Sequence, residues 1–90
     1  MSKPIIYTGR FKKNFKQRIG KVSKLNISVE KRIKLFIKDR RNPLLKDHGL
    51  KGELSAYRSF SITGDIRIIY IEKDDCFIFS DIGSHNQVYE

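Results

Sequence analysis

The residues of this chain best suited to proton transfer are its two histidines, His48 and His85. His48 lies in the segment Lys46–Gly52, and His85 lies in the segment Asp81–Tyr89. Both segments are polar and contain glycine, so we expect each histidine in a loop or at a strand end, outside the apolar core. Imidazole changes its protonation state near neutral pH, which suits it to acid–base catalysis there. Two such groups on a strongly basic chain indicate acid–base chemistry on a polyanion.

Positive charge is concentrated in the first half of the chain. Residues 1–52 carry 16 Lys and Arg against 3 Asp and Glu, whereas residues 53–90 carry 3 against 7, which together give the net charge of +9. A basic half of this kind attracts a nucleic acid through its phosphates or an acidic protein through its carboxylates. The alternative is that these side chains are only the solvated faces of helices.

Length and composition narrow the class of protein. The 90 residues are enough for one domain, residues 1–90, and too few for a second. No apolar run approaches the roughly 18 residues of a membrane-spanning helix, and the first residues lack the apolar stretch of a signal peptide. The single cysteine, Cys76, cannot form an internal disulfide, which is typical of the reducing cytoplasm. Because neither Cys76 nor the histidines have zinc-ligand spacing, we expect a cytoplasmic protein with no metal, no other cofactor and no membrane partner.

The elements that must position the histidines begin with a strand over residues 3–7 and a helical hairpin over residues 8–41. Apolar residues recur every three or four positions in the hairpin, as on the buried face of a helix. The first helix follows Thr8 as its N-cap, and the second begins at Asn26 or Ser28. The residues expected on the buried faces are Phe11, Phe15, Ile19 and Val22 in the first helix and Val29, Ile33, Phe36 and Ile37 in the second.

The second half of the chain predicts antiparallel strands over residues 53–83. Strand-forming residues predominate in residues 54–62, 66–72 and 76–82, and tight turns separate these runs. Such a series favours an antiparallel meander, followed by a tail over residues 84–90. The predicted fold is therefore α+β, with the N-terminal strand and the helical hairpin packed on one face of a small antiparallel sheet. The core is expected to contain Phe60, Tyr70 and Cys76.

Three motifs together resemble a known family of toxins. They are Lys46–Gly52, then Tyr57–Arg58 followed by Gly64–Tyr70, and finally Gly83–Tyr89. Over nearly the whole chain the sequence resembles the RelE/ParE superfamily, and most closely the YafQ-like branch of type II toxin–antitoxin systems. The resemblance implies a RelE-like compact ribonuclease fold and an endoribonuclease that cleaves mRNA in the ribosomal A site. It also implies a cognate antitoxin that wraps the toxin in a hetero-oligomer and silences it.

The resemblance carries active-site roles to individual residues. In YafQ-like toxins the histidines of the first and last motifs belong to the active site, and His48 and His85 match them. An aspartate before the central strand is matched by Asp65, and an aromatic residue that helps to hold the substrate is matched by Tyr89. In RelE-like toxins a strand arginine stabilises the reacting phosphate, and Arg67 matches that position.

Three positions depart from the pattern of this family. Ser61 stands where the branch often has a further histidine, Ile66 stands where an aromatic residue often follows the aspartate, and Asp81 stands where an arginine is common. These departures leave open how the catalytic work is divided among the residues that remain.

Metal-free ribonuclease chemistry can also be argued from the residues themselves. RNA carries its own nucleophile, the 2′-hydroxyl, so the protein must supply a base, an acid for the leaving 5′-oxygen and a cation for the phosphorane. His48 or Asp65 is the candidate base, and His85 is the candidate acid. Arg67 is the candidate cation. The residues expected to bind the substrate are Arg58, Lys46, Lys51 and Tyr89, whose ring can stack on a base.

Each candidate also has an explanation that involves no chemistry. His48 could satisfy a loop carbonyl or cap a helix, and Asp65 could be a turn residue beside glycine. Arg67 could be a solvent-facing strand residue, and Arg58 a cross-strand partner.

For the whole chain, the alternatives are a ParE-like inhibitor of DNA gyrase and a decayed toxin that only binds RNA or an antitoxin. An acidic antitoxin segment could lie along the basic helical half or a sheet edge.

Overall fold

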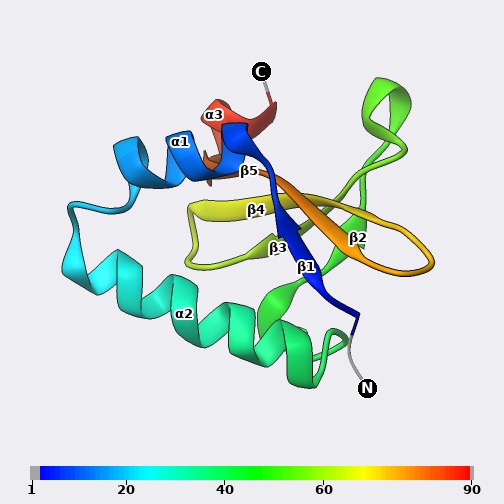
Figure 1. The fold of residues 1–90 in the computed structure, drawn as a ribbon, viewed down its shortest axis with the longest axis horizontal. Helices are drawn as coiled ribbons and strands as arrows, with labels where there is room; N and C mark the ends of the chain where they lie inside the picture. The colour runs from blue at the N-terminus through cyan, green and yellow to red at the C-terminus, as the bar shows by residue number, and fades with distance from the viewer. Residues whose placement is uncertain (1–2, 90) are drawn as a thin grey trace.

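The computed structural model describes residues 3–89, and these residues form one sheet with helices around it (Figure 1). The elements in chain order are β1 (Ile5–Tyr7), α1 (Gly9–Arg18), α2 (Ser23–Lys38), the 3-10 turn η1 (Pro43–Leu45), β2 (His48–Gly49), the 3-10 turn η2 (Gly52–Leu54), β3 (Arg58–Ser61), β4 (Ile66–Glu72), β5 (Phe77–Ser84) and α3 (His85–Tyr89). The strand order is β1-β5-β4-β3-β2. β1 is parallel to β5, and the other neighbours are antiparallel. The predicted α+β fold is confirmed.

The apolar core lies between the two long helices and one face of the sheet. Phe36 of α2 is at its centre, where its ring stacks on Phe60 with 4.7 Å between centroids and meets Tyr70, Phe77 and Phe79 edge-on. Such aromatic packing buries a large apolar area in a small domain. The buried residues that complete this core are Phe11, Ile19, Val29, Leu45, Ile62, Ile68 and Ile82. The core predicted for Phe60 and Tyr70 is confirmed.

The connection between the two helices differs from the prediction. The side chain of Thr8 accepts a hydrogen bond from Phe11 N at 3.1 Å, so the predicted cap of α1 is confirmed. α2, however, begins at Ser23, and Val22, which was expected on the buried face of the first helix, is 46% exposed. Asn26 lies inside α2, where its amide donates to carbonyls of the preceding turn, including that of Gly20 at 3.0 Å. This bond stabilises the turn between the two helices. Asn26 forms it from inside α2, four residues after the N-cap position at Val22.

Three further features of the fold differ from their predictions. Ile37, expected in the buried stripe of the second helix, is exposed, whereas its neighbour Phe36 is buried in the core. The strand expected over residues 54–62 is shortened to β3, since the chain first forms η2 with Gly52 at a φ of 66°, where glycine has no steric penalty. The predicted tail begins with the last residue of β5 and continues as helix α3.

Helix α1 covers the part of β5 that β1 is too short to reach. β1 pairs only with residues Phe77–Phe79. Beyond them, Asp81 is buried and accepts a hydrogen bond from Asn14 at 2.7 Å, and Arg18 donates to the carbonyl of Ile82 at 3.0 Å. Asp81 therefore anchors α1 to the edge of the sheet.

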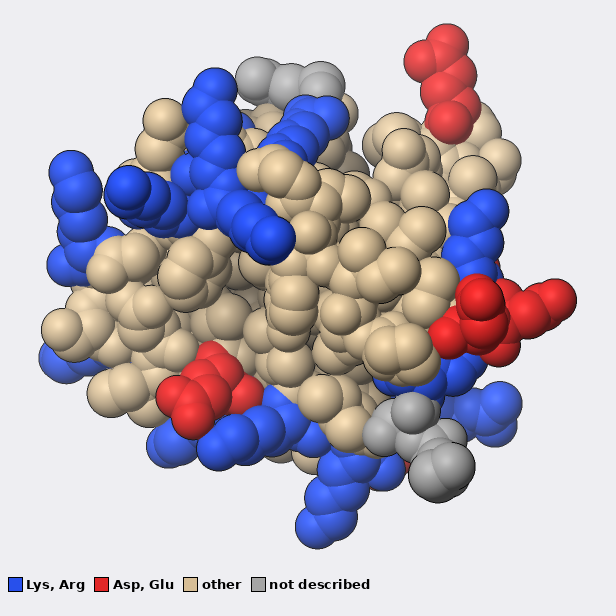
Figure 2. Space-filling model, viewed as in Figure 1, with Lys and Arg blue, Asp and Glu red and all other residues tan. Residues whose placement is uncertain are grey.

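Positive side chains surround the helical side of the molecule. In Figure 2, Lys and Arg gather over α1 and along α2, with a largely uncharged surface between them. This distribution fits the charge difference between the two halves of the sequence. None of the helices within residues 3–89 combines the length and apolar character that crossing a bilayer requires.

Candidate active site

The register of the strands brings His48 and Arg67 to the same face of the sheet. His48 pairs with Ser59 across β2 and β3, and Ser61 pairs with Arg67 across β3 and β4. Directly opposed residues project to the same face, as do residues two apart on one strand. We call this the open face, defined by His48, Ser59, Ser61, Arg67 and Ile69; it is opposite to the face that carries Phe60 and Tyr70.

Helix α3 carries His85 and Tyr89 over the open face. Its start is fixed by a capping box, in which Gln87 N donates to Ser84 Oγ at 3.3 Å and Ser84 N donates to Gln87 Oε1 at 2.8 Å. His85 and Tyr89 are four residues apart and therefore share one side of the helix, with their ring centroids 4.4 Å apart. Tyr89 Oη donates to Ser59 Oγ at 2.9 Å, which ties α3 to β3.

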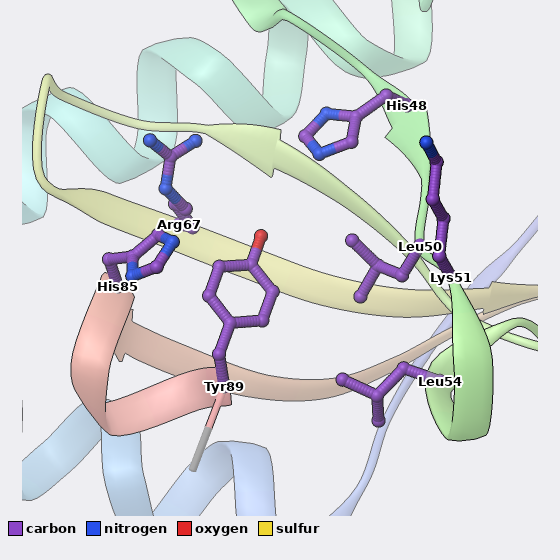
Figure 3. Close-up of a pocket in the computed structure, with 7 residues that line it drawn as sticks. All are labelled: His48, Leu50, Lys51, Leu54, Arg67, His85 and Tyr89. Atoms are coloured by element: carbon purple, nitrogen blue, oxygen red, sulfur yellow. The ribbon is translucent and has the colours of Figure 1, made fainter.

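The two histidines border one cavity of about 370 Å³ on the open face (Figure 3). Its lining consists of His48, Leu50, Lys51, Leu54, Arg67, His85 and Tyr89. In Figure 3, His85 and Tyr89 project from α3, Arg67 projects from β4, and His48 lies across from them on β2. Both histidines are exposed, so the cavity, which we call the histidine cavity, is open to a large substrate.

A backbone carbonyl orients the imidazole of His48. His48 Nδ1 is 2.8 Å from the carbonyl oxygen of Lys46. A carbonyl oxygen only accepts hydrogen bonds, so Nδ1 carries the hydrogen and the lone pair of neutral His48 is on Nε2. Lys46 turns its carbonyl this way because its backbone is left-handed, with a φ of 49°, at the end of η1. In this tautomer, neutral His48 has the lone pair of Nε2 available to accept a proton.

The residue before His48 anchors the loop to the other face of the sheet. Asp47 has a side chain only 7% exposed, and it accepts hydrogen bonds from Tyr70 Oη at 2.6 Å and from Arg58 Nε at 3.0 Å. Arg40 is close enough to Asp47 for a further ion pair, at 3.7 Å. Burial, together with the hydrogen bond to Asp47, raises the pKa of Tyr70 above its ordinary value. Sequence reasoning missed this anchor, because its partners come from three distant segments.

Arg67 and Lys51 are the Lys and Arg side chains that line the histidine cavity. Arg67 is half-buried, and its Nη1 donates to Ser61 Oγ at 3.2 Å, while its buried Nε has no hydrogen-bond partner among residues 3–89. A buried N–H without a partner favours an acceptor that reaches it, and guanidinium N–H groups match the oxygens of a phosphate. Ser61 thus holds the arginine in position.

A comparison with protein families identifies the chain. Residues 3–90 match the family described as bacterial toxin of type II toxin–antitoxin system, YafQ. The chain belongs to the YafQ toxin family. It is thus a toxin of a type II toxin–antitoxin system, as the sequence motifs predicted. A search of curated proteins found no match.

Solved structures of other toxins share the fold of this YafQ-family chain. YafQ from Escherichia coli strain BL21(DE3) is 24% identical, with a TM-score of 0.84 over 98% of this chain and 99% of that chain. The toxin–antitoxin complex of E. coli DinJ and YafQ matches at 25% identity and a TM-score of 0.82, over 100% of both chains. A copper-bound mutant toxin from Helicobacter pylori is 27% identical, with a TM-score of 0.75 over 97% of this chain and 99% of that chain.

Three of the predicted site residues lie outside the histidine cavity of this YafQ-family toxin. Asp65 is exposed in the turn between β3 and β4, where its N–H donates to Thr63 Oγ1 at 3.2 Å. Arg58 projects to the opposite face and is engaged by Asp47 and Tyr70. Lys46 lines a second cavity. Of the two candidate bases, His48 lines the histidine cavity and Asp65 does not.

The structure also bears on metal binding by this YafQ-family toxin. Within residues 3–89, no group of three or more histidine, cysteine or acidic side chains is arranged to hold a metal ion. The histidine cavity contains two imidazoles but no carboxylate or thiolate in its lining. No metal-ligand set is therefore assigned to the described residues.

Proposed function

We propose that this YafQ-family toxin is an endoribonuclease that cleaves mRNA on the ribosome by metal-free acid–base catalysis. The observation that carries the proposal is the pair of exposed imidazoles, His48 and His85, on one open cavity beside the guanidinium of Arg67. His48 comes from the edge strand β2 and His85 from α3, the helix after β5, and a phosphodiester bound in the cavity would lie between them. This arrangement suits a reaction that needs a base and an acid at the same time.

The proposed reaction uses the 2′-hydroxyl of the RNA as the nucleophile. His48 Nε2 accepts the proton of the 2′-hydroxyl while O2′ forms a bond to phosphorus. The bond between phosphorus and O5′ breaks, and protonated His85 gives its proton to O5′. The products are a 2′,3′-cyclic phosphate and a 5′-hydroxyl, and one proton has moved from substrate to His48 while another has left His85. Solvent exposure of both rings allows these protons to exchange with water before the next cycle.

The other residues of the cavity are proposed to stabilise and hold the substrate. Arg67 would donate to the phosphate oxygens as negative charge grows on the phosphorane, and Lys51 adds a second positive charge. The hydroxyl of Tyr89 is occupied by Ser59, so its ring is the part that can contact a base. Leu50 and Leu54 add apolar surface on the opposite side of the cavity (Figure 3).

Dependence on the ribosome is supported by the exposure of the site. Because both histidines are exposed, the protein alone offers few contacts that could hold a flexible RNA in the geometry for in-line attack. A ribosome that already holds the mRNA codon would supply that geometry. The positive surface over α1 and α2 would contact ribosomal RNA, and this binding should weaken as salt rises (Figure 2).

A cognate antitoxin is the second proposed partner. E. coli YafQ has been solved in complex with the antitoxin DinJ, and this chain aligns with that YafQ over its full length. The net charge of +9 favours an acidic antitoxin. We propose that an acidic protein encoded by a neighbouring gene binds this toxin and prevents cleavage of the mRNA.

The proposed function is tested by adding the toxin to a cell-free translation reaction and mapping the new ends of the mRNA. We expect cuts within ribosome-bound codons that leave 5′-hydroxyl and 2′,3′-cyclic phosphate ends. His85→Gln should reduce cleavage by about 10²-fold or more, as expected when a general acid is lost. Asn86→Gln, at the adjacent exposed position of α3, is the matched control and should cleave normally. Circular dichroism of each variant checks that it is folded.

Three outcomes would overturn the proposal. Full cleavage by folded His85→Gln would show that His85 takes no part in the cleavage reaction. DNA breaks with intact mRNA would favour the gyrase inhibitor instead, and an intact mRNA together with intact DNA would favour a decayed toxin that only binds.

A further inference from the structure

A second cavity adjoins the histidine cavity, and Arg67 lines both. It has a volume of about 320 Å³, and its lining includes Arg32 of α2, Lys46 of the loop before β2, and Thr63 and Gly64 of the turn between β3 and β4. We call it the Arg32 cavity. Because one guanidinium borders both spaces, a strand of RNA with its scissile phosphate at Arg67 could continue into the Arg32 cavity.

The cations of the Arg32 cavity are available to an anion. Arg32 donates from Nη1 to the carbonyl of Leu44 at 2.6 Å and to the carbonyl of Ser61 at 3.3 Å. Neutral carbonyls fix the position of the guanidinium but leave its charge unbalanced. Lys46 is exposed and forms no ion pair among residues 3–89, and no acidic residue belongs to the lining. The cavity therefore presents three positive side chains, Arg32, Lys46 and Arg67, without a carboxylate.

Another cluster of arginines shows the contrast. Arg40, Arg41 and Arg58 line a cavity on the other side of the sheet, but Asp47 belongs to that lining too. There Arg58 is paired with Asp47, and Arg40 is paired with Glu72 at 2.7 Å. Internal carboxylates already pair with Arg40 and Arg58, so among these three arginines only Arg41 forms no ion pair within residues 3–89.

The turn at the rim of the Arg32 cavity is fixed and uncrowded. Thr63 Oγ1 accepts hydrogen bonds from the N–H groups of Asp65 and Ile66, at 3.2 and 3.0 Å. At Gly64, a side chain would meet nothing within 4 Å, so the space beside the turn is open. A fixed turn beside open space can accept a sugar–phosphate backbone without rearrangement.

We propose that the Arg32 cavity binds the phosphate next to the scissile one in the same RNA strand. This inference rests on the proposed function and adds a second, sequence-independent phosphate contact to it. Lys46 then serves both cavities, because its carbonyl orients His48 while its side chain lines the Arg32 cavity. The substrate class is single-stranded RNA with at least two consecutive phosphates.

The proposal is tested by titrating the toxin with two non-cleavable RNAs and following the protein by NMR. The probes are 2′-O-methyl UpU, which has one phosphate between its nucleosides, and 2′-O-methyl UpUpU, which has two. We expect both to shift the signals of His48 and His85, and only UpUpU to shift those of Thr63 and Gly64 as well. The second phosphate should strengthen binding by roughly fivefold or more, as expected for charge-assisted hydrogen bonds.

The double variant Arg32→Gln/Lys46→Gln isolates the Arg32 cavity. Its gain in affinity from UpU to UpUpU should be lost, and its cleavage of ribosome-bound mRNA should fall through weaker binding. Lys24→Gln is the control: it removes a positive charge from the same helix, about 12 Å away from Arg32 along its axis. It should retain the gain from the second phosphate.

The outcomes separate this inference from the proposed function. Shifts at both histidines without any at Thr63 and Gly64, or an unchanged gain in the double variant, would overturn the second phosphate site and leave the proposed function intact. An absence of shifts at both histidines would count against the proposed function itself. Shifts at Thr63 and Gly64 with a poly-glutamate peptide but not with UpUpU would assign the Arg32 cavity to an acidic protein.

Discussion

Asp47→Ala should destabilise the protein strongly and release the loop that carries His48. The carboxylate of Asp47 accepts hydrogen bonds from Tyr70 Oη and Arg58 Nε and has a side-chain exposure of only 7%. Its removal leaves the hydroxyl of buried Tyr70 without its acceptor, at about 1–3 kcal/mol. The loss at Arg58 and Arg40 is smaller than for fully buried charges, since their side chains are 35% and 27% exposed and can be hydrated. We therefore expect the free energy of unfolding to fall by roughly 2–4 kcal/mol.

Urea unfolding at pH 7 measures this change, with Asp74→Ala as the control for loss of an exposed carboxylate. Asp74 lies in the turn between β4 and β5 and is exposed, so its substitution should change the free energy of unfolding by less than about 0.5 kcal/mol. A second measurement is the tautomer of His48 from the NMR shifts of its ring nitrogens. In Asp47→Ala we expect a smaller fraction of the Nδ1–H form, because the turn that holds the Lys46 carbonyl has lost its anchor.

The reasoning would be refuted if Asp47→Ala lost less than about 1 kcal/mol, since the hydrogen bonds to Asp47 would then contribute little more than a surface ion pair. An unchanged tautomer of His48 in a clearly destabilised variant would show that the anchor supports the fold but does not orient the histidine.

Two further predictions concern stability. Tyr70→Phe should make the free energy of unfolding less sensitive to alkaline pH. The folded-state pKa of Tyr70 lies above its ordinary value of 10.0, because burial and Asp47 favour the neutral hydroxyl. The stability that this shift contributes is complete below pH 10 and is lost as the pH rises toward the folded-state pKa. Urea unfolding between pH 9 and 11 should therefore show a steeper loss in the wild type than in Tyr70→Phe, and parallel curves would contradict the shift. Phe36→Ala should cost about 3–5 kcal/mol, because the ring is 2% exposed and packs on four other aromatic rings. Ile37→Ala, at the adjacent exposed position, should cost far less in the same assay.

Local signals in the sequence were sufficient for the order and type of most elements. β4 spans the predicted residues 66–72, since its run of β-branched residues is unambiguous and both ends are marked by turn residues. The cap at Thr8 was also predicted from local chemistry. The short helix α3 was missed although its capping box, Ser84 with Gln87, is present in the sequence. Five residues of helix are too few for a periodic apolar pattern to appear.

Other features depend on contacts that no local pattern contains. Val22 and Ile37 continue the predicted apolar periodicity of the two helices, but Val22 lies in the turn before α2 and both side chains are exposed. The pairing of β1 with β5 joins the two ends of the chain and is parallel, which the predicted meander did not include. A Cβ at Gly83 would lie 2.7 Å from the side-chain ends of both Arg18 and Gln87, which approach it from α1 and α3 and would have to move.

The candidate site was partly predictable for the same reasons. His48, His85, Arg67, Tyr89 and Lys51 were proposed from residue types and motifs, and the fold gathers these five around one cavity. A cross-strand partner of Arg58 was one of the sequence-based explanations, but its ion pair with Asp47 was not anticipated, since it depends on the register between β2, β3 and β4.

The central claim, that His85 acts as the acid opposite the base His48, is tested most directly with a sulfur leaving group. A ribosome-bound mRNA with a 5′-bridging phosphorothiolate at the cleaved linkage needs no acid, because a thiolate leaves without protonation. His85→Gln should cleave the normal linkage about 10²-fold more slowly than the wild type and the sulfur linkage at nearly the wild-type rate. His48→Gln should be impaired on both linkages. Equal impairment of His85→Gln on the two linkages, or rescue of His48→Gln by sulfur, would contradict the assignment.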